Sequence, residues 1–176
     1  MRRLLTKPVT WVGLAVVLAG LIAGLAVFEP WRAFTSSRLD EPVPVAVSEP
    51  AAPATTATTM PPAPVVLAEG AFVSQEHDTA GTARVLELAD GSRLLRLEGF
   101  ATSDGPDVHV WLSDATAGGD WHSYDDGRYV PLGEIKATDG NHNYVIPADA
   151  DLAGLRSAVI WCDRFNVAFG SAALAL

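Results

Sequence analysis

Ser157-Ala-Val-Ile-Trp-Cys-Asp-Arg-Phe-Asn-Val-Ala-Phe-Gly170 is the stretch of sequence that decides the fold. It is rich in β-branched and aromatic residues, as buried strands are, and it contains the only cysteine of the chain, Cys162. Strand alternation places Cys162 and Trp161 on opposite faces. A break at Asp163-Arg164 separates this run from a second one that begins at Phe165. The stretch therefore predicts two short strands or one bulged strand.

The rest of the chain from residue 65 to 176 shows the same pattern of short strands. Apolar runs alternate with turn residues at roughly ten-residue spacing, and no long stretch has the period of a helix. The pattern predicts an all-β domain, an antiparallel β-sandwich of about eight short strands. Asp90-Gly91 predicts a tight hairpin between the second and third strands. The expected strands are 70–76, 82–88, 93–100, 108–113, 129–135, 143–147, 158–162 and 165–174.

The N-terminal part of the chain predicts a membrane anchor. Three basic residues lie within residues 1–8, and residues 9–28 form an uncharged apolar run. At about 1.5 Å rise per residue, such a run spans roughly 30 Å, the thickness of a bilayer core. The basic residues favour a cytoplasmic N-terminus and an extracytoplasmic C-terminal domain at the cell membrane, with a single-pass helix between them. A cleaved signal peptide is the alternative, although its apolar region usually runs only about 7–15 residues.

A segment rich in Pro, Ala and Thr separates this anchor from the β domain. Nine of the twelve prolines lie within the first 64 residues. Residues 29–64 predict a disordered linker that cannot bury a core, either a plain spacer or an O-glycosylated stalk. From residue 64 on, 17 Asp and Glu stand against 7 Lys and Arg, which argues against nucleic acid as a partner. The single cysteine excludes an intramolecular disulfide. We also expect the domain to be a monomer.

Few side chains in the domain predict chemistry. Cys162 also has a purely structural interpretation, because free cysteine is among the most buried residue types and packs as a small hydrophobe. The histidines lack the spacing of a metal motif, so no metal site is predicted. His109 and His142 each adjoin an expected strand, and they are the two that folding could bring near Cys162. Asp104 and Asp107 lie on the loop before His109 and predict an acidic turn in preference to a calcium site.

Three motifs, taken in order, carry a resemblance to a known family. They are Gly105-Pro-Asp-Val-His-Val-Trp-Leu-Ser113, Leu132-Gly-Glu-Ile-Lys136 with Asn143-Tyr-Val-Ile-Pro147, and Val159-Ile-Trp-Cys-Asp-Arg-Phe-Asn-Val-Ala-Phe-Gly170. Over about residues 68–176, the chain resembles the DM-thirteen domain, the electron-transfer DM family. The resemblance implies a secreted or membrane-tethered β-sandwich with a role in extracellular electron transfer. In that family the signature cysteine, matched by Cys162, acts as a bare thiol or ligates a group such as haem.

Two functional hypotheses follow. The first is a redox module in which Cys162 is the catalytic residue, and Cys162, His109, Trp161 and Phe165 form the cofactor-binding set. The identity of the cofactor stays open, with haem as one candidate, and the electron partner is a separate redox protein. The second is a non-catalytic module that binds a cell-surface partner, with Trp111, Trp121 and Tyr124 as surface aromatics and Cys162 as packing.

Overall fold

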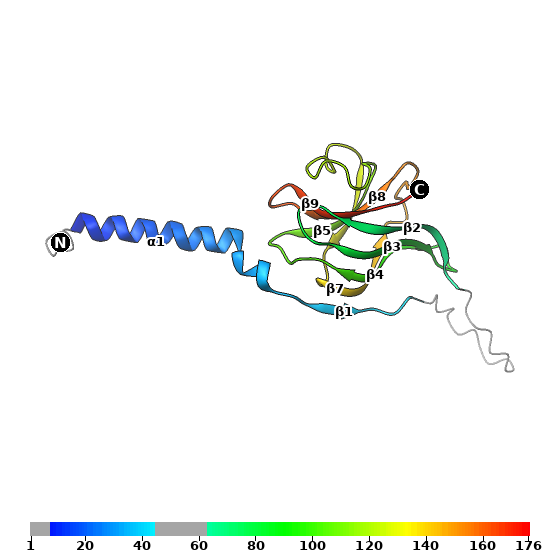
Figure 1. Cartoon of the computed structure of the whole chain (residues 1–176), viewed down its shortest axis with the longest axis horizontal. Coiled ribbons are helices and arrows are strands. Elements are labelled where there is room, and N and C mark those ends of the chain that lie inside the picture. Colours follow the sequence, from blue (N-terminus) through cyan, green and yellow to red (C-terminus); the bar gives the residue numbers. More distant parts are fainter. Residues whose placement is uncertain (1–7, 45–62) are drawn as a thin grey trace.

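The structure, a computed structural model, describes residues 8–44 and 63–176. Its first element, α1 (Pro8–Phe28), is an apolar helix that projects away from the β domain (Figure 1). Over Thr10–Phe28 it is long and apolar enough to cross a membrane. The helix ends because Glu29 adopts a left-handed conformation (φ 40°) and is followed by Pro30. A short 3-10 helix, η1 (Pro30–Phe34), then leads the chain to the domain.

Nine strands in the described residues form one continuous sheet, which confirms the all-β prediction. Their order is β1-β7-β4-β3-β2-β9-β8-β5-β6. All eight predicted strands are present, and the predicted hairpin connects β3 and β4. The bounds are β1 Arg38–Asp40, β2 Val65–Ser74, β3 Ala80–Glu87, β4 Arg93–Ala101, β5 Val108–Ser113, β6 Tyr129–Glu134, β7 Asp139–Ile146, β8 Ser157–Cys162 and β9 Val167–Ala173.

Strand β2 connects the two halves of this sheet. It pairs with β3 as far as Ala71 and with β9 from Phe72 onward. Gly70 lies where the partners change, and a Cβ there would overlap the carbonyl oxygen of Ala173. Glycine therefore permits the close approach that lets the sheet curl. The two halves come to face each other, as the layers of a sandwich do (Figure 1).

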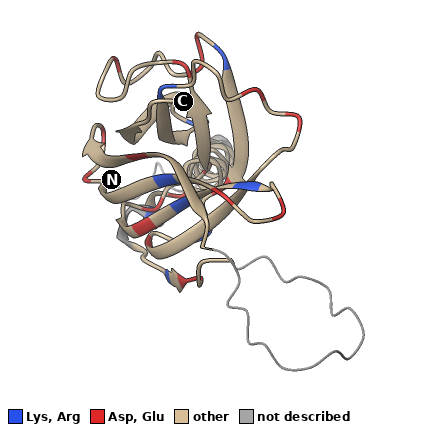
Figure 2. Ribbon diagram, turned by 90° about the vertical axis from the view of Figure 1, so that its right-hand side faces the viewer, with Lys and Arg blue, Asp and Glu red and all other residues tan. Residues whose placement is uncertain are grey.

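The core lies between the two halves of the curled sheet. Alternate residues point inward along each strand, as the sequence pattern predicted. Val85 and Leu95 from one half and Val110 and Ile160 from the other are fully buried in the same cluster. Outside this core the domain is acidic, and Asp and Glu are spread over its loops (Figure 2).

A second, smaller cluster covers the outer face of β5 and β8. Trp111, Tyr124 and Trp161 are buried in it, under the loop of residues 114–128. The hydroxyl of Tyr124 lies 2.9 Å from the Ser171 hydroxyl, and this contact holds the loop down. The interpretation of Trp111 and Tyr124 as surface aromatics is therefore wrong, because the loop folds back over the sheet. Trp121 alone of that group is exposed, at 42%.

Part of the predicted linker is folded. Strand β1 pairs in parallel with β7, from Arg38 opposite Asp139 to Asp40 opposite Asn141. The N–H of Ser37 donates to the Thr138 hydroxyl at 2.8 Å. The structure thus differs from the composition-based prediction over residues 30–40, since docking at a sheet edge uses backbone hydrogen bonds and needs no apolar core. The rest of the predicted linker, residues 45–62, lies outside the described residues.

Candidate functional site

Cys162 is the last residue of β8 and lies directly before a turn at residues 163–166. Its side chain has no exposed surface and belongs to the core between the two sheet halves. Trp161, one position earlier, lies in the outer cluster. The predicted alternation of these two side chains is confirmed.

Three backbone N–H groups lie near the sulfur of Cys162. They belong to Phe165, Arg164 and Asp107. Burial raises the pKa of the thiol above its ordinary value, and these N–H groups offset only part of the rise. The neutral thiol is therefore the resting form at neutral pH.

The surroundings of Cys162 do not fit a macrocycle such as haem. The side chain is 0% exposed, and among the described residues it lines none of the four cavities characterised. Val108 on β5 and Val167 on β9 are its direct strand partners, and both are buried. Haem ligation through this sulfur would displace packed core side chains.

The predicted cofactor-binding residues do not converge on one pocket. His109 and Trp161 are cross-strand partners on the outer face, whereas Cys162 faces inward. Phe165 lies in the exposed turn and stacks on Phe28 at the end of α1, with ring centroids 6.1 Å apart. His142 lies on β7, where it packs edge-on against Phe100 and Tyr144 in the core.

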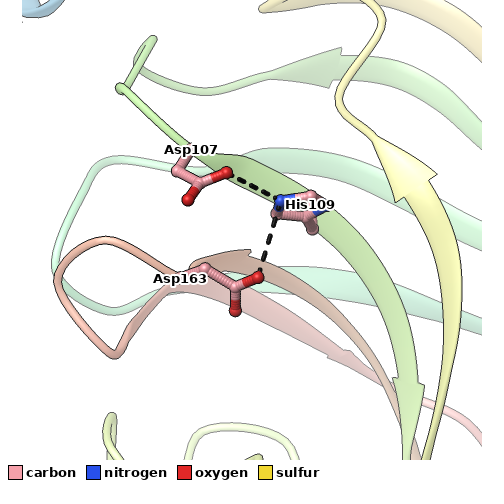
Figure 3. A group of neighbouring side chains, drawn as sticks. All are labelled: Asp107, His109 and Asp163. Carbon is pink, nitrogen blue, oxygen red and sulfur yellow. Dashed lines mark hydrogen bonds and ion pairs between the residues drawn. The ribbon is translucent and has the colours of Figure 1, made fainter.

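Three other side chains do converge at this end of the domain: Asp107, His109 and Asp163 (Figure 3). The Nε2 atom of His109 lies 3.0 Å from Asp107 Oδ1 and 3.6 Å from Asp163 Oδ2. Asp107 directly precedes β5 and Asp163 directly follows β8, and the two strands are antiparallel neighbours. The N–H of Asp163 donates to the Asp107 carbonyl at 2.9 Å, which fixes the two backbones relative to each other.

Sequence reasoning missed this group because its members are distant in the chain. Metal motifs are recognised by short spacings, but Asp163 comes to His109 only through the pairing of β5 with β8. One signal could have found it. One predicted strand starts at residue 108 and another ends at residue 162. If these strands are antiparallel neighbours, the two positions lie side by side at the same end of the sheet.

A row of aromatic side chains begins beside His109. Trp161 is its cross-strand partner and stacks on Trp111 with centroids 5.0 Å apart. Trp111 in turn stacks on Tyr129 at 4.2 Å. Tyr129 is 39% exposed, so the row leads from the edge of the outer cluster to the protein surface.

The end of the domain that carries these groups also contacts helix α1. The guanidinium of Arg164 donates to the carbonyl of Val27 at 3.1 Å, in the last turn of α1. Arg32 pairs with Asp104 at 3.4 Å on the loop before β5. A cavity of about 290 Å³ lies between Phe28, Phe165 and their neighbours. The Cys162 turn therefore lies on the side of the domain that faces the end of α1.

A curled all-β sheet with one buried cysteine at the end of a core strand, carried on an apolar helix, defines the class of this protein. A family model, Electron transfer DM13, matches residues 71–174. The chain belongs to this family, and the resemblance read from its motifs is confirmed. No curated protein and no solved structure matched the chain in the corresponding comparisons.

Proposed function

We propose that this chain is a membrane-tethered electron-transfer domain in which the Cys162 thiol takes part in the redox step. The family is one associated with electron transfer. The observation that supports a role for the sulfur is its position at the end of β8, directly before the exposed turn of residues 163–166, with the backbone N–H groups of Asp107, Arg164 and Phe165 nearby. Backbone N–H groups near a sulfur stabilise negative charge as it forms there.

The turn after Cys162 is the route by which a partner reaches the sulfur. Residues 163–166 are exposed, and Asn166 has a positive φ of 52°. The hydrogen bonds that close the turn are long, at 3.3 Å from Phe165 N to the Cys162 carbonyl and 3.4 Å from Asn166 N to the Asp163 carbonyl. Opening the turn uncovers the thiol and leaves the β8 pairing with β5 and β9 in place.

The single cysteine defines the reaction that this thiol can undergo. A disulfide on a separate redox protein is attacked by the Cys162 sulfur, so that one S–S bond breaks and a mixed S–S bond forms. The Cys162 sulfur is oxidised and the leaving sulfur of the partner is reduced. The proton of Cys162 passes to the leaving thiolate, which departs as a thiol.

The anchor keeps this reaction at the cell membrane. The apolar span Thr10–Phe28 crosses the bilayer as a single pass. The basic residues within 1–8 place the N-terminus in the cytoplasm, so the β domain is extracytoplasmic. The oxidised partner is then also extracytoplasmic, where disulfides persist.

One observation favours the alternative, a non-catalytic binding module at the cell surface. Cys162 has no exposed surface, as a purely structural cysteine would. Against this reading, two of the three aromatic side chains expected to meet a partner, Trp111 and Tyr124, are buried under the 114–128 loop. Of the three, only Trp121 is exposed.

Replacement of Cys162 separates the two functions. We expect Cys162→Ser to abolish mixed-disulfide formation with a small-molecule disulfide, and to lower stability by about 1–3 kcal/mol because an unpaired hydroxyl enters the core. Cys162→Ala should abolish the reaction with a smaller loss of stability. Ile160→Val is the matched control: it weakens the same strand by about 1 kcal/mol and keeps the thiol.

The measurement is thiol titration of the full chain before and after unfolding, together with its visible absorption spectrum. A thiol that reacts in the native wild type and in Ile160→Val supports the proposal. A thiol that reacts only after denaturation, in a colourless protein, would favour the binding module.

A further inference from the structure

We propose that Asp107, His109 and Asp163 bind a divalent first-row transition-metal ion. Each residue offers one donor atom, and the three donor atoms lie within 4.8 Å of one another. His109 Nε2 faces both carboxylates, at 3.0 Å and 3.6 Å, so the three side chains point at a common position (Figure 3). Small outward shifts of these side chains open that position to an ion with ligand distances of about 2.0–2.2 Å.

The donor set selects the class of ion. One imidazole nitrogen with two carboxylate oxygens suits Zn²⁺, Cu²⁺, Ni²⁺ or Co²⁺. It does not suit Ca²⁺, which takes about six to eight oxygen ligands. The side chains of His109, Asp107 and Asp163 are 21%, 36% and 46% exposed, so solvent can fill the remaining coordination positions.

The backbone holds these donors in place without an ion. His109 lies within β5, paired on one side with Trp161 of β8 and on the other with Glu134 of β6. Asp107 and Asp163 flank the same two strands and are joined by the 2.9 Å bond from the Asp163 N–H to the Asp107 carbonyl. A site built on paired strands loses little conformational entropy when it binds a ligand.

The charges at this position also favour a cation. In the part of the chain that the structure describes, the carboxylates of Asp107 and Asp163 make ion pairs with His109 alone. The guanidinium of Arg164 is turned away, to the carbonyl of Val27. Glu134, opposite His109, adds another negative charge on the same face. A divalent ion balances the two aspartates, whereas a protonated imidazole supplies only one positive charge.

This inference goes beyond the proposed redox role of Cys162 and does not depend on it. Cys162 faces the core, and the three donors lie on the outer side of the same strands. Each of the two proposals can therefore be disproved without affecting the other. Loss of thiol chemistry leaves metal binding intact, and loss of metal binding leaves the thiol in place.

The test is titration of the untagged full chain in detergent with Zn²⁺ and Co²⁺ by calorimetry, and with Cu²⁺ by electron paramagnetic resonance. We expect one ion per chain, with Cu²⁺ bound more tightly than either Zn²⁺ or Co²⁺. The Cu²⁺ spectrum should show coupling to one imidazole nitrogen. His109→Gln and Asp163→Asn should each weaken binding by at least about tenfold, and His109→Gln should remove the nitrogen coupling.

Two variants of exposed residues outside the group serve as controls. His122→Gln and Asp126→Asn should leave the affinity unchanged within about twofold, because neither side chain belongs to the group. Thermal unfolding of each variant without metal checks that it is folded. Absence of stoichiometric binding by the folded wild type would overturn the proposal, and so would binding that His109→Gln does not weaken. Retention of binding in Cys162→Ser shows that the thiol is not the ligand.

Discussion

Cys162 and His109 lie on neighbouring strands at the same end of the domain, yet their side chains point to opposite faces of the sheet. Both were predicted to hold one cofactor, and the alternation of strand side chains prevents it. A shift of one residue in either strand would have put them together. At this scale the sequence predicted the face of Cys162 and of Trp161 correctly. It could not predict which faces of two distant strands match, because register is a property of the pairing.

Gly140 offers a test of how a single residue permits docking of β1. It has φ 115°, and a Cβ there would overlap the carbonyl oxygen of Leu39 on β1. Gly133 has nearly the same φ, 113°, with nothing within 4 Å of a built Cβ. We expect Gly133→Ala to cost about 1–3 kcal/mol from backbone strain alone. Gly140→Ala should cost more, because it also expels β1 from the sheet edge.

Chemical denaturation measures the two free energies of unfolding, and hydrogen exchange at residues 38–41 reports whether β1 is still paired. Loss of protection in Gly140→Ala but not in Gly133→Ala is the expected result. Equal protection in both variants would show that the close approach at Gly140 is not what holds β1.

His142 gives the domain a pH dependence of stability. Burial lowers its pKa, against the raising effects of the Asp139 carbonyl and the Glu41 carboxylate. The unfolded chain therefore takes up a proton at a higher pH than the folded chain does. Above about pH 6.5 the imidazole is neutral in both states and contributes nothing to the pH dependence. Below that pH, protonation of the unfolded state reduces the free energy of unfolding.

His142→Gln should flatten this fall in stability between about pH 6.5 and pH 5, since glutamine cannot protonate and still offers a donor to the Asp139 carbonyl. The midpoint of denaturant unfolding, measured at several pH values, checks it. His122→Gln, at an exposed histidine, is the control for the loss of an imidazole. A wild-type midpoint that does not change over this range would contradict the expectation.

At the scale of elements, the eight longer strands were predictable and the rest was not. Alternating apolar residues identified strands such as β5 and β8, since half of each strand must face the core. Strand β1 has only three residues, Arg38-Leu-Asp40, and all three are exposed. Its place is determined by the free edge of β7, which no local pattern in β1 encodes. The loop over Trp111 was missed for a similar reason, as its contacts are with distant strands.

The contribution of β1 is measurable by truncation. A fragment of residues 35–176 keeps β1, one of residues 45–176 removes it, and one of residues 63–176 also removes the segment between. We expect all three to fold, because the core lies entirely within β2 to β9. The second and third should be less stable than the first by about 1–3 kcal/mol. They lose contacts such as the bond from the Asn143 N–H to Glu41 at 2.6 Å and that from the Lys136 ammonium to the same carboxylate at 2.9 Å.

Denaturant unfolding of the three fragments provides the comparison. Equal stability of all three would mean that β1 pairs with β7 without stabilising the domain. A difference only between the second and third fragments would assign the effect to residues 45–62.

For the whole molecule, the apolar helix α1 and the acidic β domain followed from composition, but their contact did not. Apolar length identified α1 and charge counts identified the acidic domain. The contacts between Phe28 and Phe165 and between Arg32 and Asp104 bring the helix end to the Cys162 side of the domain. The two residues of each pair are more than seventy positions apart in the sequence, and no local sequence pattern predicts that they are in contact. The orientation of the Cys162 turn towards the end of α1 thus depends on contacts that form only in the folded chain.

In the proposed membrane-tethered arrangement, the attachment of β1 to β7 sets the distance between the domain and the bilayer. The chain leaves α1 at Glu29 and is already attached to the domain at Ser37, which allows at most roughly 30 Å of extended chain and less through η1. The Pro-rich residues 45–62 come after this fastening, so lengthening or shortening them leaves the clearance unchanged. A partner that reaches the Cys162 turn must fit into that narrow gap, and the gap therefore favours small or flat partners that are themselves confined to the membrane surface.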